Sequence, residues 1–311
     1  MVWLSVGLRA IVNVEALNMV ESIGNIVRHR KAAIVYRRQD GSYVLRYVPA
    51  VSGESMAHAY QSWLVHLSKE RKLPVCEFCE KEEFVKHAQP ELFGKSKWEE
   101  DLKLSIEASK SKGKSKEEKE SQKSQELSII VEKIEEEIVR NCVVEDIGGF
   151  LFAGENPVKR TSRFYASYMV PSFDALDKSS LEPQMQVRHA PTASLLYKQA
   201  QMPYSVEVGS AVYSWSSMLD LGSIGICSYS TTKQAIKEDE RINRIKLAID
   251  ALSLMLESGV FGAKRTRFNP LIEYESLLIA VSRNLPFTAS PPSVRDYVAR
   301  TVGRIKPLMN N

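Results

Sequence analysis

The stretch that decides the fold is residues 2–16, VWLSVGLRAIVNVEA. Every even position in it is apolar, while the odd positions include Ser5, Arg9 and Glu15. This period of two is typical of a strand that buries one face. The same polar residues interrupt any continuous apolar block, so neither a secretory signal nor a membrane span is expected here. The chain is therefore predicted to open with a long, half-buried strand.

Further elements follow on both sides of an Asp-Gly turn. Residues 32–36 and 43–48 are β-rich and flank Asp40 and Gly41, a pair typical of a hairpin turn. An amphipathic helix is predicted from about Ser52 to residue 71. Residues 16–31 lack a clear period and are interpreted as a functional loop.

The second half of the chain repeats the alternation of strand and helix. Alternation returns over residues 204–218, and residues 242–256 carry a helical stripe that ends before Gly259, a suitable C-cap. A strand over 271–281 and a helix over 293–305 complete the pattern. The order strand, helix, strands, helix, strand predicts an α+β fold, namely an RNA-recognition-motif (ferredoxin-like) core with helical and β-hairpin insertions.

Composition limits the class of protein. The chain has 311 residues, 44% of them apolar, which suffices for a substantial core. Its net charge of +4 is too small for a uniformly cationic coat, so the positions of the basic residues matter more than their number. Four cysteines in this length do not make a disulfide scaffold, and a reducing cytoplasm fits best. Residues 109–125 are almost wholly Ser, Lys, Glu, Gln and Gly, which predicts a solvated loop.

Three short basic clusters lie in predicted loops. They are residues 28–31 (RHRK), 159–163 (KRTSR) and 264–267 (KRTR). Lys and Arg neutralise phosphate charge, and the neighbouring small residues let main-chain N–H groups approach phosphate oxygens. Any one cluster can be ordinary surface charge, but three of them on one core favour RNA binding.

Two other classes of protein are alternatives. Cys76 and Cys79 have the spacing of half a zinc site and His87 follows, but no second pair lies nearby, and Cys142 and Cys227 stand alone. A zinc-stabilised structural protein is therefore one alternative. The other is an endoribonuclease that uses His58 or His189. Neither constellation is complete, so we expect no catalytic residues, no metal and no cofactor.

Several motifs together resemble a known family. They are residues 18–25 (NMVESIGN), 46–61 (RYVPAVSGESMAHAYQ), 148–150 (GGF) leading to 157–163 (PVKRTSR), and 262–268 (GAKRTRF). In order and spacing they resemble the backbone subunit of archaeal type I-A CRISPR Cascade, the DevR-type autoregulator family. Residues 109–125 look like an extra or elongated insertion for that family.

The resemblance implies a domain organisation. Residues 1–73, 146–158 and 203–311 would form an RNA-recognition-motif palm, with a β-hairpin insertion at 18–50. Residues 74–145 would be a helical, finger-like insertion and residues 159–202 a thumb-like one. The chain would polymerise head to tail along one guide RNA (crRNA) in an antiviral complex, with target DNA and other Cascade subunits as partners and no membrane.

The resemblance, together with the basic clusters, also implies which residues bind RNA. They are Asn18, Ser22, Gly24, Asn25, Arg28, His29, Arg30, Ser52, Gly53, His58, Gln61, Lys159, Arg160, Arg163, Lys264, Arg265 and Arg267. Related type III subunits cleave target RNA with an aspartate in the loop after the first strand, but residues 16–31 contain no aspartate and only Glu21 as an acid. A scaffold without nuclease activity is therefore predicted.

Overall fold

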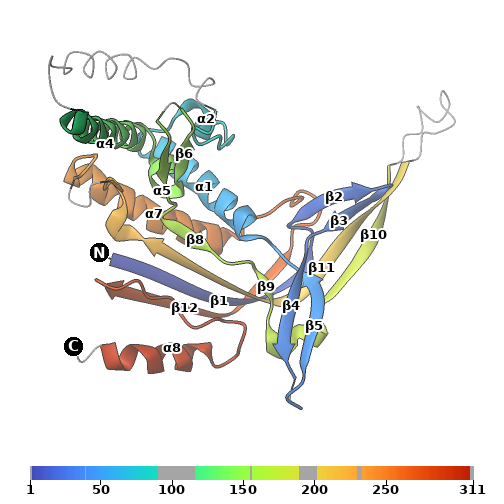
Figure 1. Ribbon diagram of the computed structural model, residues 1–311. Coiled ribbons are helices and arrows are strands. Elements are labelled where there is room, and N and C mark those ends of the chain that lie inside the picture. Colours follow the sequence, from blue (N-terminus) through green and yellow to red (C-terminus); the bar gives the residue numbers. More distant parts are fainter. Residues whose placement is uncertain are drawn as a thin grey trace, which may run out of the picture. The chain divides into compact units, whose positions relative to one another are not determined.

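The computed structural model describes residues 2–38, 40–89, 116–154, 156–188, 202–229 and 233–308. It is a mixed α+β structure with two compact units (Figure 1). The helical unit comprises Met1–Val2, Tyr60–Phe164 and Leu219–Ser258. The sheet unit comprises Trp3–Ala59, Tyr165–Met218 and Gly259–Asn311. No described helix is both long enough and apolar enough to cross a bilayer.

The main sheet is built around β1 (Val2–Glu15), which confirms the predicted long first strand. β1 lies between β12 (Leu271–Arg283) and β11 (Met202–Asp220). On its other side β11 is followed by β3 (Ile26–His29) and β2 (Met19–Ile23). The strands β8 (Phe164–Ala166), β9 (Val170–Pro171) and β10 (Ser180–Arg188) also pair with β11.

β1 is more buried than its alternation predicts. Its even positions from Leu4 to Val12 are buried, but so are Ser5 and Arg9 on the other face, while Val14 near its end is exposed. The helix α8 (Tyr297–Ile305) lies beside β1 and β12 (Figure 1), where the Tyr297 hydroxyl is 3.3 Å from the Gly7 carbonyl oxygen and 3.1 Å from Ser276 Oγ. Arg9 is tolerated there because Asp174 and Glu275 bind its guanidinium at 3.0 and 2.8 Å.

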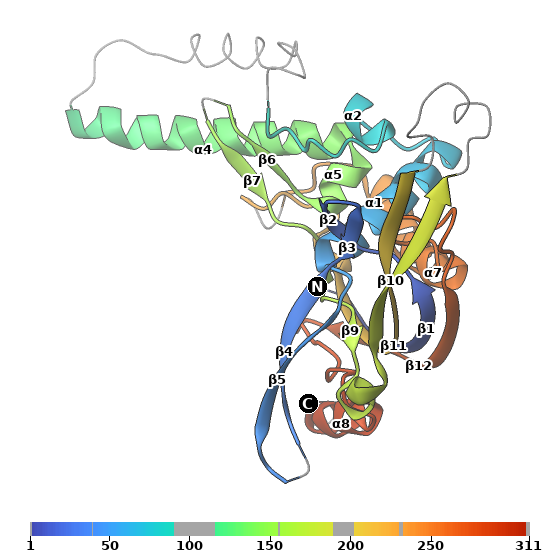
Figure 2. The same ribbon diagram turned by 90° about the vertical axis from the view of Figure 1, so that its right-hand side faces the viewer.

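Two β-hairpins extend the sheet unit. The predicted hairpin is confirmed as β4 (Lys31–Arg37) and β5 (Tyr43–Pro49), which pair only with each other among the described strands (Figure 2). The interpretation of residues 16–31 as a loop is wrong, because β2 and β3 form a second hairpin within it. Gly24 supplies the positive φ of its turn, at +60°. Exposed side chains on both faces of β2 hide the period of two.

The helical unit contains most of α1 (Gly53–Glu70), together with α2 (Glu77–Glu80), α4 (Lys116–Asn141), α5 (Val143–Gly148) and α7 (Glu238–Ser258). It also holds the small hairpin of β6 (Phe150–Phe152) and β7 (Val158–Arg160). One side of α4 packs on this hairpin through Ile134, Ile138 and Val158. Short 3-10 turns are formed by Phe173–Lys178, Leu221–Ser223 and Lys306–Leu308.

The predicted charged loop of residues 109–125 is wrong in its second half. Residues 116–125 belong to the first turns of α4, while residues 109–115 lie outside the described part of the chain. Lys and Glu are good helix formers, and opposite charges spaced four apart stabilise an exposed helix. A sequence too polar for a core therefore still forms a helix here.

Candidate nucleic-acid interface

Asn18 joins three segments of the sheet unit that are far apart in the sequence. Its side chain is buried, and its Oδ1 accepts hydrogen bonds from the Ser52 main-chain N at 2.8 Å and from Arg30 Nε at 3.0 Å. Arg30 N also donates to the Asn18 carbonyl at 2.8 Å. These bonds fix the end of β1, the end of β3 and the start of α1 against one another. Ser52 then caps α1, since its Oγ accepts from Ser55 N at 3.1 Å.

The basic loop at residues 262–268 is attached to the same place. Ala263 N donates to the Leu17 carbonyl at 2.7 Å, and a Cβ added at Gly262 would lie 2.7 Å from Leu17 Cβ. Gly262 has a φ of +77°, so glycine is required both by the backbone and by the close approach. Phe268 anchors the other end of the loop in a buried cluster with Ala16, Val206 and Val208.

Two of the three basic clusters thus meet at Leu17 and Asn18. Lys264 and Arg267 are exposed, and Arg265 is half-buried. Arg267 Nη1 donates to the Tyr204 hydroxyl at 2.7 Å, and Arg265 Nη2 donates to Asn269 Oδ1 at 2.9 Å. Exposed Ser22, Gly24 and Asn25 form the tip of the β2–β3 hairpin. This surface combines cations with small polar groups, as a nucleic-acid backbone requires.

An acidic residue that the sequence analysis missed holds part of the first cluster. Glu207 Oε1 lies 3.9 Å from Arg28 Nε and 3.5 Å from Lys31 Nζ, and its Oε2 accepts from His29 N at 2.9 Å. Arg28 and Lys31 nevertheless remain 42% and 38% exposed at their side chains. The alternation of β11 placed Glu207 on a strand, but nothing in the sequence indicated its partners.

His29 does not reach the surface, which contradicts its predicted contact with RNA. Its buried ring Nε2 lies 2.9 Å from Glu15 Oε2, and Glu15 Oε1 accepts from the Tyr213 hydroxyl at 2.6 Å. Burial opposes ionisation of both partners, but their mutual hydrogen bond and charge raise the pKa of His29 and lower that of Glu15. The pair is a buried support beneath the Leu17–Asn18 junction, since Glu15 Oε2 also accepts from Leu17 N at 2.8 Å.

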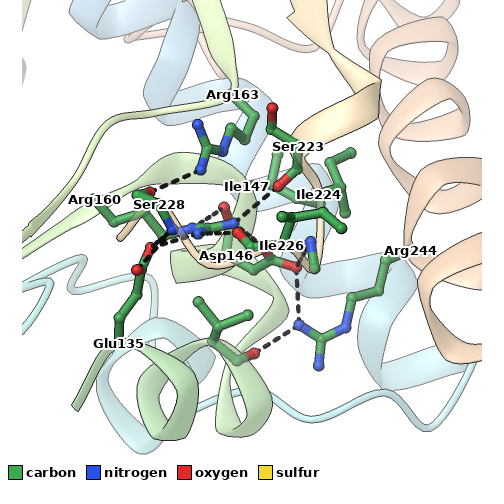
Figure 3. A network of polar contacts seen from close by, with 12 residues as sticks. Glu135, Asp146, Ile147, Arg160, Arg163, Ser223, Ile224, Ile226, Ser228 and Arg244 are labelled. Atoms are coloured by element: carbon green, nitrogen blue, oxygen red, sulfur yellow. Dashed lines mark hydrogen bonds and ion pairs between the residues drawn. The ribbon is translucent and has the colours of Figure 1, made fainter. Parts of the chain in front are cut away.

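The third cluster lies in the helical unit, and only part of it is accessible. Lys159 is exposed, but Arg160 is buried in an ion-pair network (Figure 3). Arg160 Nη1 binds Glu135 Oε1 at 2.7 Å, Nη2 binds Asp146, and Nε donates to the Asp146 carbonyl at 2.9 Å. Arg244 Nη1 donates to the Asp146 carboxylate, at 3.0 Å from Oδ2. The prediction that Arg160 contacts RNA is therefore wrong.

The remaining predicted residues differ in accessibility. Arg163 is half-buried and donates to Ser228 Oγ at 3.0 Å, and its pKa is lowered by burial and by the nearby Arg160. Gln61 is buried against Gly148, where an added Cβ would lie 2.7 Å from Gln61 Oε1. At Gly53, an added Cβ would lie 2.5 Å from the Ala166 carbonyl oxygen. His58 is exposed on α1, and His189 lies outside the described residues.

Comparison with known proteins gives one matching family and several similar proteins. Residues 6–302 match the family described as "CRISPR-associated negative auto-regulator DevR/Csa2". The chain is 39% identical to "CRISPR-associated protein Cas7/Csa2 1" of Saccharolobus solfataricus, over 95% of this chain and 84% of that protein. It is 36% identical to "CRISPR-associated aCascade subunit Cas7/Csa2 2" of the same organism, over 99% and 88%.

The matches define the class of protein as CRISPR-associated. Within that class, the chain belongs to the DevR/Csa2 family.

Proposed function

We propose that the chain is the guide-RNA-binding backbone subunit of a type I-A Cascade and acts as a scaffold. Membership of the DevR/Csa2 family supports this, as does the relative that is described as an aCascade subunit. The observation that carries the proposal is the junction at Leu17 and Asn18, where two basic segments more than 200 residues apart in the sequence are hydrogen-bonded to adjacent residues.

This surface suits a strand that is held by its backbone. Lys264, Arg267, Arg28 and Lys31 supply positive charge, and the exposed amides and hydroxyls of the β2–β3 turn supply donors for phosphate and 2′-hydroxyl oxygens. Such contacts carry little sequence information. Base pairing between guide and target DNA would supply sequence recognition, as it does in other RNA-guided effectors.

We further infer that the main sheet is an RNA-recognition-motif palm. The element order β1, α1, β8 with β9, β11, α7, β12 reproduces the β-α-β-β-α-β pattern, and β1 pairs with both β11 and β12. The helices between residues 74 and 145 would form the finger-like insertion, and β10 would belong to the thumb-like one, whereas β8 and β9 would be counted with the palm. Head-to-tail repetition of such a unit generates an open helical filament along the guide.

The experiment that tests the proposal removes the loop cations. Lys264→Ala/Arg265→Ala/Arg267→Ala protein should bind a spacer-length RNA more weakly, and the slope of log affinity against log salt should fall by about 2, at roughly 0.7 per lost phosphate contact. Lys237→Ala/Lys246→Ala/Lys306→Ala is a matched control, because those three lysines are exposed and lie outside the basic loops. Equal affinity and slope in the two variants would overturn the proposal.

The same preparations test the nuclease alternative. We expect guide RNA to remain intact in the presence of Mg²⁺ or Mn²⁺. Metal-dependent cleavage that disappears in Glu21→Ala protein would show that the chain is an enzyme and not only a scaffold.

A further inference from the structure

Three of the four cysteines meet in the helical unit, although the sequence separates them widely. Cys76 directly precedes α2, Cys79 lies within it, and Cys142 stands at the junction of α4 and α5. Their sulfur atoms all lie within 4.8 Å of one another. Cys79 and Cys142 are buried, Cys76 is half-buried, and all three are free thiols.

A buried carboxylate lies beside one of the three sulfurs. Glu145, one turn after Cys142, is fully buried, and its Oε1 lies 3.9 Å from Cys76 Sγ. His87 Nδ1 lies 2.9 Å from the same oxygen. Among the described residues, Glu145 Oε2 accepts no hydrogen bond of acceptable geometry, even though His87 Nδ1 is 2.7 Å away. The buried carboxylate therefore has His87 as its close partner and Cys76 as a neighbour.

We propose that Cys76, Cys79 and Cys142 bind one Zn²⁺ through their thiolates, with the Glu145 carboxylate at the fourth position and His87 orienting that carboxylate. Three sulfur donors favour a soft or borderline ion over Mg²⁺ and Ca²⁺, which prefer oxygen. A closed tetrahedral set of protein ligands is the structural type of zinc site. A hydrogen bond from His87 to a ligating carboxylate is the usual support from the next layer of residues.

Binding of zinc to three cysteines is coupled to the release of protons. A cysteine binds zinc as its thiolate, so each thiol of the cluster must lose its proton when the ion binds. Zn²⁺ would displace the thiol protons, which leave to solvent, so its affinity should fall as the pH falls.

The surrounding backbone gives such an ion a structural purpose. Between residues 74 and 88, α2 has only four residues, and Glu82, Lys86 and His87 adopt positive φ angles that non-glycine residues rarely adopt. A segment with so little helix and no strand can gain order from a bound ion that cross-links it to the rest of the fold. The ion would join it to the start of α5.

The test uses the full-length chain and Zn²⁺ alone. After removal of metal with a chelator and reconstitution with ZnCl₂ under reducing conditions, elemental analysis should find one zinc per chain. Cys76→Ser and Cys142→Ser should each lose most of that zinc. Cys227→Ser is the matched control, because Cys227 is buried in an apolar cluster outside the group of three and its loss should leave the zinc in place.

A second measurement guards against variants that fail to fold. Co²⁺ added to the wild-type chain should give thiolate-to-metal charge-transfer absorption that added Zn²⁺ abolishes. Three results would overturn the proposal: no zinc retained by the wild-type chain under reducing conditions, a disulfide between two of the three cysteines that persists under those conditions, or zinc retained undiminished by both Cys76→Ser and Cys142→Ser.

Discussion

At the scale of single residues, Lys159 and Arg160 show how neighbours in one basic motif take different roles. Lys159 is exposed on β7, whereas the Arg160 guanidinium neutralises Glu135 and Asp146 in the interior. Arg160→Ala would leave two buried carboxylates short of a partner. We expect it to lower the free energy of unfolding by about 3–5 kcal/mol.

Lys159→Ala is the control for Arg160→Ala. It should leave the free energy of unfolding within about 0.5 kcal/mol of wild type, since it changes an exposed side chain. RNA affinity should fall in this variant if β7 faces the guide. Urea denaturation of both variants separates the two roles, and equal stability of the two would contradict the assignment of Arg160 to the interior.

The His29–Glu15 pair predicts a dependence of stability on pH. The raised pKa of His29 means that its contribution is complete below its ordinary value of 6.5 and is lost as the pH rises through the folded value. The lowered pKa of Glu15 means that its contribution is complete above 4.5 and is lost as the pH falls through the folded value. The pair therefore stabilises the fold most between about pH 4.5 and 6.5.

Denaturation of wild-type and His29→Gln protein across this range measures the effect. The difference in free energy of unfolding should be largest in the window and should decline on both sides. His58→Gln, which replaces a histidine on the exposed face of α1, is the matched control. If the difference in free energy of unfolding between wild type and His29→Gln did not change with pH, folding would not shift the pKa values of the pair.

At the scale of elements, Gly262 and Gly24, which both have a positive φ, allow the position of the basic loop at residues 262–268 to be tested by comparison. An added Cβ at Gly24 meets nothing within 4 Å, so Gly24→Ala should cost about 1 kcal/mol through backbone conformation alone. At Gly262 it meets Leu17 Cβ and the Leu17 carbonyl, so Gly262→Ala adds a steric cost of about 1–3 kcal/mol and displaces the loop.

The two alanine variants should therefore differ in RNA binding as well as in stability. Gly262→Ala should weaken RNA binding because Lys264 and Arg267 move with the loop, whereas Gly24→Ala should weaken it less. Fluorescence anisotropy with a labelled RNA compares them directly. Identical affinities would argue that the contact between the loop and Leu17 does not position the cations.

The sequence predicted those elements whose pattern is local. The apolar stripe along α7, together with Gly259 after its end, was sufficient to predict that helix, and Gly259 has a φ of +60°. The alternation of apolar and polar residues was sufficient to predict β1. Arg160 and Cys142 could not be assigned in this way. Their partners lie elsewhere in the chain, at Glu135 and Asp146 for the arginine and at Cys76 and Cys79 for the cysteine. Only tertiary contact distinguishes a phosphate ligand from the centre of a buried network.

At the scale of the whole molecule, the proposed filament predicts that assembly follows RNA length. A subunit that adds head to tail by one repeated contact should give complexes whose mass rises in equal steps as the RNA is lengthened. Mass photometry on a series of RNA lengths checks this. The triple variant of residues 264, 265 and 267 should need higher protein concentration to reach the same mass, and a mass independent of RNA length would contradict repetition.

The two ends of the helical segment between residues 74 and 143 meet, which bears on how the chain can vary in length. The carbonyl of Pro74 accepts a hydrogen bond from Val143 N at 2.9 Å, so the chain leaves and returns at one point. Lengthening a closed excursion costs only about 0.6 kcal/mol for each doubling of its length. Segments gained or lost between these two residues therefore need not disturb the elements outside.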